Sequence, residues 1–182
     1  MAYSTRRQIR LIGHDYSQNG IYFVTICTKD KELIFGHLSN YKMLLNKFGK
    51  IARNEWVKNA RLREYVYLDK FVIMPDHIHG ILIIKNENVL NRDLFCRVMA
   101  RHDPTPYHND IPGHKFGKPL AQSLSSVIGA YKSSVTREIN RIRKLPGHTI
   151  WQRGFYDHII RNKKELFAMR RYISNNPANH KF

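Results

Sequence analysis

Two histidines, His77 and His79, stand two residues apart in a segment that reads HIHGILII. Alternate residues of a β-strand project from the same face, so both imidazoles would point the same way. Neutral imidazole is a good ligand for divalent metal ions. Two partly buried histidines beside a sheet would give the same pattern, and the pair alone does not separate the two interpretations.

The sequence offers little for a closed zinc site or for a two-metal nuclease. Structural zinc needs four His or Cys ligands at characteristic spacings, but Cys27 and Cys96 lie far apart, and the spacing of His102, His108 and His114 is not diagnostic. No DxD or ExxE array accompanies the histidine pair. Two histidines, one amide or carboxylate oxygen and open positions suit instead Mg²⁺ or Mn²⁺ bridged to a phosphate.

Such a site lacks an evident carboxylate to activate water, which makes covalent attack on phosphorus by a side chain attractive. Among the 10 tyrosines, Tyr172 follows Arg170 and Arg171 in the segment MRRYISNNP. Asn176 comes four residues later and would share a helical face with Tyr172. The plain alternative is that Tyr172 merely flanks the packing stripe of its helix. Tyr156 is the competing candidate, interpreted as a core or DNA-stacking residue.

The charge balance indicates a polyanionic partner. The chain has 31 Lys and Arg against 14 Asp and Glu, a net charge of +17. Nucleic acid fits this excess of positive charge. A membrane surface fits it less well, because the sequence contains no basic amphipathic helix with a fully apolar face. Each cation taken alone could be a solvated surface charge. The candidate phosphate contacts are Lys132, Arg137 and Arg141 on the middle helix, Arg170 and Arg171 beside the tyrosine, and Arg6, Arg7 and Arg10 near the N-terminus. Candidate base-stacking residues are Tyr3, Tyr16, Tyr107 and Phe116.

Hydrophobic periodicity predicts the elements that must position these residues. Asn162 and Glu165 form a capping-box pair for the last helix, and Pro177 predicts that this helix stops by Asn176. The predicted strands cover residues 21–28, 65–74, 77–84 and 150–160, and the predicted helices cover 40–60, 121–143 and 162–176. This order predicts an α+β, ferredoxin-like (RRM-like) antiparallel sheet of about four strands, plus a C-terminal helix that carries Tyr172.

The length of 182 residues predicts a single domain. Residues 1–19 form a basic N-terminal arm, and residues 88–119, rich in Pro and Gly, form a long loop insertion with one short helix near 94–99. The N-terminus lacks the apolar stretch of a signal peptide, and the apolar runs are too short to span a bilayer. We therefore expect an intracellular protein.

Several segments resemble one known family. His77-Ile78-His79, preceded by VIMPD, is similar to the HUH motif, two histidines around a hydrophobic residue. The segment WQRGFYDHIIRN, followed by YISNNP, resembles the C-terminal signature of REP-associated tyrosine transposases, relatives of the IS200-like single-tyrosine transposases of insertion sequences. The segment LSSVIGAYKSSVTREIN resembles the middle helix of the family. The resemblance covers residues 15–180, and the motifs in this order are specific.

This resemblance implies a single-domain transposase that cleaves single-stranded DNA beside hairpin-forming repeats. Tyr172 would be the nucleophile of a 5′-phosphotyrosine intermediate, and His77, His79 and Asn176 would bind Mg²⁺ or Mn²⁺. Insertion-sequence relatives carry Gln where Asn176 stands. The resemblance also favours a monomer over a homodimer, and a bacterial, cytoplasmic, nucleoid-associated location.

Two other functions remain open at this stage. A non-catalytic RRM-like binding module would share the fold, although the sequence has no match to the basic-aromatic K/R-G-F/Y-x-F strand motif. A metal-dependent hydrolase that uses water would survive Tyr172→Phe. The binding module would lose nothing when His77 and His79 become alanine.

Overall fold

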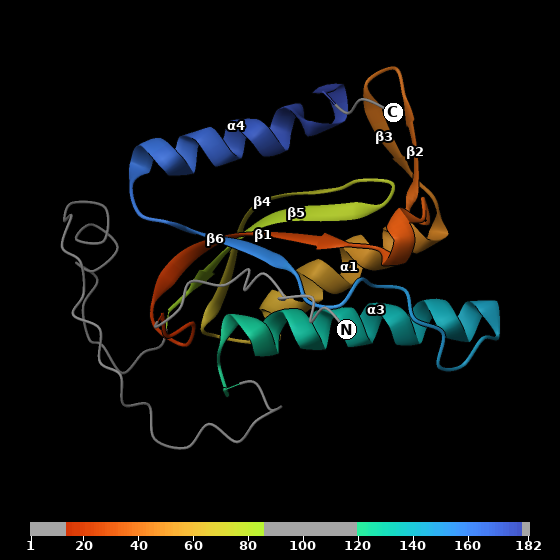
Figure 1. Ribbon diagram of the computed structural model, residues 1–182, viewed down its shortest axis with the longest axis horizontal. Helices are drawn as coiled ribbons and strands as arrows, with labels where there is room; N and C mark the ends of the chain where they lie inside the picture. The colour runs from red at the N-terminus through yellow and green to blue at the C-terminus, as the bar shows by residue number, and fades with distance from the viewer. Residues whose placement is uncertain (1–13, 86–119, 180–182) are drawn as a thin grey trace, which may run out of the picture.

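The computed structural model describes residues 14–85 and 120–179 (Figure 1). Arg6, Arg7, Arg10 and Tyr3 of the predicted arm lie outside these residues, as does the whole of the predicted 88–119 loop with its candidate helix, Tyr107 and Phe116.

A four-stranded antiparallel sheet forms the centre of the fold, with the strands in the order β4-β5-β1-β6. The strands of this sheet are β1 (Gly20–Cys27), β4 (Val66–Ile73), β5 (His77–Ile84) and β6 (Tyr156–Ile160). The helices are α1 (Lys47–Arg61), α3 (Leu124–Arg143) and α4 (Lys163–Asn179), with a short 3₁₀ turn, η1 (Lys29–Lys31). The fold is therefore α+β with a C-terminal helix, as predicted.

The helices form two layers on opposite faces of the sheet (Figure 1). Helices α1 and α3 pack together on one face, where Tyr131 Oη donates to the carbonyl of Ala52 at 3.1 Å. Helix α4 covers the other face and buries Leu166 and Ile173 against apolar residues of β1, β5 and β6. Two separate hydrophobic clusters result, one on each side of the sheet.

Strand β5 has the bounds that its alternating sequence predicts and lies inside the sheet between β4 and β1. Ile78 and Leu82 join the cluster under α1 and α3, whereas Ile81 joins the cluster under α4. Because side chains alternate along a strand, His79 faces the same side as Ile81, toward α4.

The predicted helix over 40–60 is wrong at its start. A hairpin of β2 (Gly36–Ser39) and β3 (Lys42–Leu45) occupies that region. Helix α1 begins only after Asn46, whose side chain accepts hydrogen bonds from the N–H groups of Phe48 and Gly49. An N-cap of this kind satisfies donors that the first turn leaves unpaired.

The other predicted bounds need smaller corrections. Helix α3 begins at Leu124, after the N-cap Ser123, and not at 121. Strand β6 covers only the second half of the predicted 150–160 strand, and Trp151 makes an isolated bridge to Thr28 instead.

The prediction that the last helix stops by Asn176 is wrong, because α4 continues through Pro177 to Asn179. Proline removes one N–H and disfavours helical dihedrals in the residue before it. Here that cost falls in the last turn, and the burial of Ile173 against the sheet holds the helix in place. The predicted N-terminal cap is confirmed: Glu165 N–H donates to Asn162 Oδ1 at 2.9 Å, and the Glu165 carboxylate accepts from Arg161 N–H at 3.0 Å.

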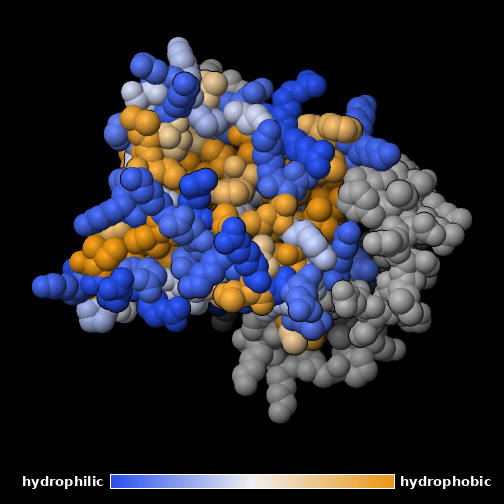
Figure 2. Space-filling view, turned by 180° about the vertical axis from the view of Figure 1, so that it is seen from behind, coloured by the Kyte–Doolittle hydropathy of each residue, from blue (hydrophilic) through white to orange (hydrophobic). Residues whose placement is uncertain are grey.

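The surface mixes hydrophilic side chains with hydrophobic ones, as the view from behind shows (Figure 2). In the described ranges, no helix is both long enough and apolar enough to cross a membrane.

Candidate functional site

The two histidines at the start of β5 lie with their ring centroids 4.5 Å apart. His79 is 6% exposed, and its Nδ1 lies 2.8 Å from the hydroxyl of Thr25 on β1. His77 Nδ1 lies 2.5 Å from a carboxylate oxygen of Asp76. A partner at Nδ1 fixes the orientation of each ring.

The pairing of strands places Thr25 beside His79. Thr25 is the register partner of His79 on β5 and of Tyr156 on β6. Directly paired residues of adjacent strands share a face of the sheet, so Thr25, His79 and Tyr156 form a row on the side that α4 covers. Tyr156 is 50% exposed at the end of this row, on the edge strand.

Buried backbone contacts hold the turn that presents His77. Thr28, which is fully buried, donates from both its N–H and its hydroxyl to the carbonyl of Asp76, each at 2.8 Å. The N–H of Met74 donates to the carbonyl of His77 at 2.8 Å. The β4–β5 turn is thereby fixed to the end of β1, and Asp76 is positioned next to His77.

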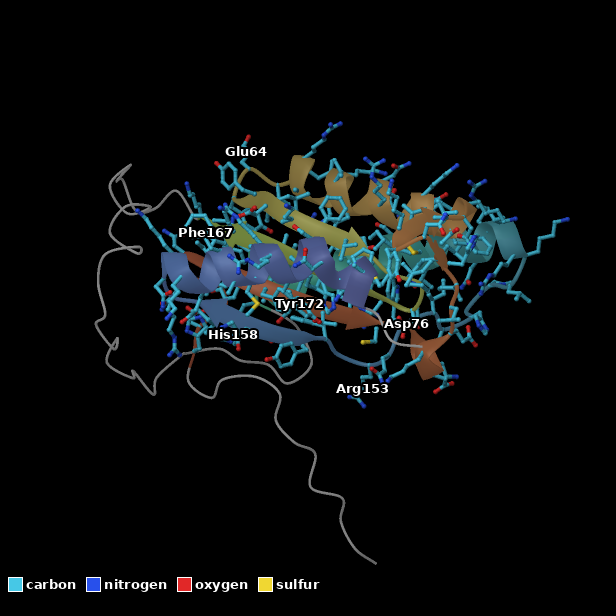
Figure 3. The ribbon with its side chains drawn as sticks, turned by 90° about the horizontal axis from the view of Figure 1, so that it is seen from above. Glu64, Asp76, Arg153, His158, Phe167 and Tyr172 are labelled. Carbon is cyan, nitrogen blue, oxygen red and sulfur yellow. The ribbon has the colours of Figure 1, made fainter. Side chains whose placement is uncertain are left out.

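Tyr172 lies on α4, the helix that covers this face of the sheet (Figure 3). Its hydroxyl lies 3.3 Å from His79 Nε2, and the two rings are 5.1 Å apart between centroids. Phe23 of β1 lies against both rings, at 5.3 Å from His79 and 5.9 Å from Tyr172. Tyr172 is nevertheless 47% exposed, so its hydroxyl can be approached from solvent.

Asn176 lies one helical turn beyond Tyr172 and is only 9% exposed. Its Oδ1 is buried without a hydrogen-bond partner among the residues that the structure describes. A buried amide oxygen left without a donor costs free energy, which an ion or a donor group would offset. In the described ranges no three His, Cys, Asp or Glu side chains cluster. Imidazole nitrogens and amide oxygens are donor types that suit a divalent cation.

The predicted phosphate contacts lie in different surroundings. Arg170 pairs with Asp69 on β4 at 2.6 Å, and Arg141 pairs with Glu138 at 3.0 Å. Arg137 and Arg171 are exposed.

Two of the other predicted nucleic-acid contacts are engaged within the fold. Lys132 Nζ donates to the carbonyls of Gln152 and Gly154 at 2.6 and 2.9 Å. Tyr16, a predicted stacking residue, packs against Tyr22 and the core instead.

Sequence reasoning missed two residues of the site, Thr25 and Asp76. Asp76 directly precedes the first histidine, so its position offered a signal. Nothing local marks Thr25, because its role depends on the register between β1 and β5.

Known proteins include relatives of this chain. No family model matches the chain. The chain is 34% identical, over 94% of its own length and 88% of the relative, to an uncharacterized protein of Haemophilus influenzae. It is 25% identical, over 91% of its length and 74% of the relative, to a protein of the same organism whose name assigns it to the REP-associated tyrosine transposases.

A solved structure shares the fold. It is a REP-associated tyrosine transposase bound to a REP hairpin, with a TM-score of 0.57, 20% identity, and coverage of 92% of this chain and 72% of that one. In sequence and in fold, the chain is therefore similar to REP-associated tyrosine transposases.

Proposed function

We propose that this protein is a metal-dependent single-stranded DNA endonuclease and strand transferase. It would cleave DNA beside hairpins through a covalent 5′-phosphotyrosine link on Tyr172. The observation that supports this most directly is the 3.3 Å distance between the Tyr172 hydroxyl and His79 Nε2, two atoms whose residues stand 93 positions apart in the chain.

Tyr172 is suited to the nucleophile's role by position and exposure. Its oxygen would bond to phosphorus while the bond from phosphorus to the 3′ oxygen breaks. The phenol proton passes to solvent, and the departing 3′ oxygen takes up a proton to become a hydroxyl. The covalent link keeps the energy of the phosphodiester, so an incoming 3′-hydroxyl can reverse the step without ATP.

The histidines and Asn176 would provide the metal site. His77, His79 and Asn176 would hold a divalent cation, Mg²⁺ or Mn²⁺, which when bound polarises the scissile phosphate. Thr25 and Asp76 support this assignment because each keeps an imidazole oriented from its Nδ1 side. Phe23 packs against His79 and Tyr172 and limits their rotation.

Two observations support DNA as the partner: the net charge of this chain and the ligand of a solved structure with the same fold. The net charge of +17 favours a polyanion. A transposase of the same fold was solved bound to a REP hairpin, so single-stranded DNA with a hairpin is the proposed substrate. We further propose that the whole chain forms one transposase-like domain that acts as a monomer.

A denaturing gel with end-labelled hairpin oligonucleotides from genomic repeats tests the proposal. We expect a protease-sensitive adduct on the 3′-side fragment with Mg²⁺ or Mn²⁺ and none with a chelator. Tyr172→Phe and His79→Ala should each abolish the adduct. Tyr156→Phe is the matched control, because it removes a second exposed phenol from the same face and should leave the adduct intact.

Other outcomes would identify the alternative functions. An adduct that persists in Tyr172→Phe and disappears in Tyr156→Phe would move the nucleophile to Tyr156. Cleavage without any adduct, unchanged in Tyr172→Phe, would indicate a hydrolase that uses water. Tight binding without cleavage, unchanged in His77→Ala and His79→Ala, would indicate a non-catalytic binding module.

A further inference from the structure

A second basic feature lies on the layer opposite α4, away from the tyrosine. The C-terminal half of α3 and the following segment, residues 144–154, enclose an open groove, here called the α3 groove. Six cationic side chains line it, and no Asp or Glu does. They are Lys29, Lys132, Arg137, Arg141, Lys144 and Arg153.

Most of this charge is available to a ligand. Arg137, Lys144, Arg153 and Lys29 are exposed, and within the described ranges none of them makes an ion pair with a carboxylate. Arg141 is the exception, because Glu138 accepts from it at 3.0 Å. Unpaired cations held close together repel each other, and a row of phosphates would relieve that repulsion.

Internal hydrogen bonds hold the walls of the groove in place. Lys132 Nζ joins α3 to the carbonyls of Gln152 and Gly154. Trp151 Nε1 donates back to the carbonyl of Lys132 at 3.1 Å. Asn140 Nδ2 donates to the carbonyl of His148 at 2.8 Å. The two walls are therefore ordered before any ligand binds, which lowers the entropic cost of binding.

The groove starts at the end of the sheet where the histidine pair lies. Gln152 N–H donates to the carbonyl of Cys27, and Cys27 is the register partner of His77. Lys29 N–H donates to the carbonyl of Ile150. Figure 3 shows Arg153 and Asp76 toward the same end of the molecule, away from Phe167. A strand that passes the histidines can therefore continue around this end of the sheet toward α3.

We propose that the α3 groove binds the sugar–phosphate backbone of the same DNA strand, several nucleotides from the step that Tyr172 cleaves. This inference rests on the proposed function in one respect: the proposed function supplies single-stranded DNA as the ligand of the groove. The strand would cross from the α4 layer, where it is cut, to the α3 layer, where it is held.

Two variants that lose the same number of charges test whether the α3 groove contributes to DNA binding independently of cleavage. The groove variant is Arg137→Gln with Lys144→Gln and Arg153→Gln. The control is Lys50→Gln with Arg53→Gln and Arg61→Gln, three exposed cations of α1 outside the groove. Both lose three charges at exposed positions, and thermal unfolding should show that both remain folded.

Fluorescence anisotropy with labelled hairpin oligonucleotides across a salt series measures binding. We expect the groove variant to bind roughly 10-fold more weakly at low salt and its salt slope to fall by about 3, approximately one for each lost phosphate contact. The control should change far less. Shortening the single-stranded flank should weaken the wild type but not the groove variant, because only the wild type uses the distal phosphates.

The adduct assay keeps the two proposals apart. At saturating protein the groove variant should still form the Tyr172 adduct. If the wild type forms no adduct and the groove variant still loses affinity, the groove inference stands and the proposed function fails. Equal weakening in both variants, unchanged binding in the groove variant, or no DNA binding by the wild type would overturn the groove inference.

Discussion

The guanidinium of Arg170 on α4 donates to both carboxylate oxygens of Asp69 on β4, through Nε at 2.9 and 3.1 Å and through Nη2 at 2.6 Å. Paired hydrogen bonds of this kind fix orientation as well as distance. Asp69 lies within the irregular stretch of β4 between Leu68 and Phe71, where the pairing with β5 shifts register. This contact therefore joins the helix that carries Tyr172 to the strand next to β5.

Replacing Asp69 with Asn tests whether Arg170 positions the helix or contacts DNA. Because the pair is partly exposed, we expect a loss of about 1 kcal/mol or less in the free energy of unfolding, with faster hydrogen exchange in α4 and reduced adduct formation. Affinity for DNA should stay the same. Tighter DNA binding in Asp69→Asn would instead show that the ion pair competes with a phosphate for Arg170.

Thr25→Val should weaken the proposed metal site without changing the shape of the side chain. Valine cannot hydrogen-bond His79 Nδ1, so the imidazole loses the partner that orients it. Loss of such outer partners costs roughly 10–100-fold in metal affinity or activity. Calorimetric titration with Mn²⁺ should show that loss, and Thr25→Ser should restore most of the affinity. Equal Mn²⁺ affinity in all three proteins would remove Thr25 from the site.

Gly80→Ala should destabilise the fold through the face opposite His79. A methyl group at Gly80 would overlap the ring of Trp56, which α1 buries against β5. Overpacking a rigid, buried contact costs about 1–3 kcal/mol, which chemical denaturation can measure. Gly129→Ala is the control, because a methyl group there meets no atom within 4 Å and removes a helical glycine. A neutral Gly80→Ala would mean that Trp56 can move away.

The cap of α4 predicts a pH dependence. The hydrogen bond from Arg161 N–H, with help from Asn162, lowers the pKa of the Glu165 carboxyl below its ordinary value of 4.5. The ionised carboxylate therefore stabilises the fold above pH 4.5, and this contribution falls as the pH drops through the lowered folded value. Glu165→Gln should lower the melting temperature at pH 7, and the difference from wild type should shrink toward pH 3. A difference that is independent of pH would contradict this.

The sequence predicted the parts of the fold that depend on local periodicity. Strand β5 was predicted at its exact bounds, because alternation and the preceding Pro75-Asp76 turn define both ends. Helix α3 was predicted to within three residues at its start and exactly at its end. The hairpin of β2 and β3 was missed because each strand has only four residues. Its apolar residues instead seemed to extend the helical pattern that leads to Trp56.

The candidate site could be predicted only in its residue types. Histidine spacing and the MRRYISNNP segment identified His77, His79 and Tyr172, and the structure brings Tyr172 against His79. Contacts that depend on tertiary pairing stayed out of reach, including Thr25 with His79 and Asp69 with Arg170. Lys132 was predicted to be a phosphate contact on the surface, although burial lowers its pKa and two carbonyls accept hydrogen bonds from its Nζ.

The residues of the site come from three distant parts of the chain: Thr25 from β1, the histidines from β5, and Tyr172 from the last helix described. During synthesis, the sheet strands β1, β4 and β5 can leave the ribosome and pair before α4 exists. Until α4 docks, the apolar face of Ile21, Phe23 and Ile81 stays uncovered and Tyr172 is absent from the histidine pair. Under the proposed function, a nascent or truncated chain that lacks α4 would therefore carry the histidines without being able to form the covalent adduct.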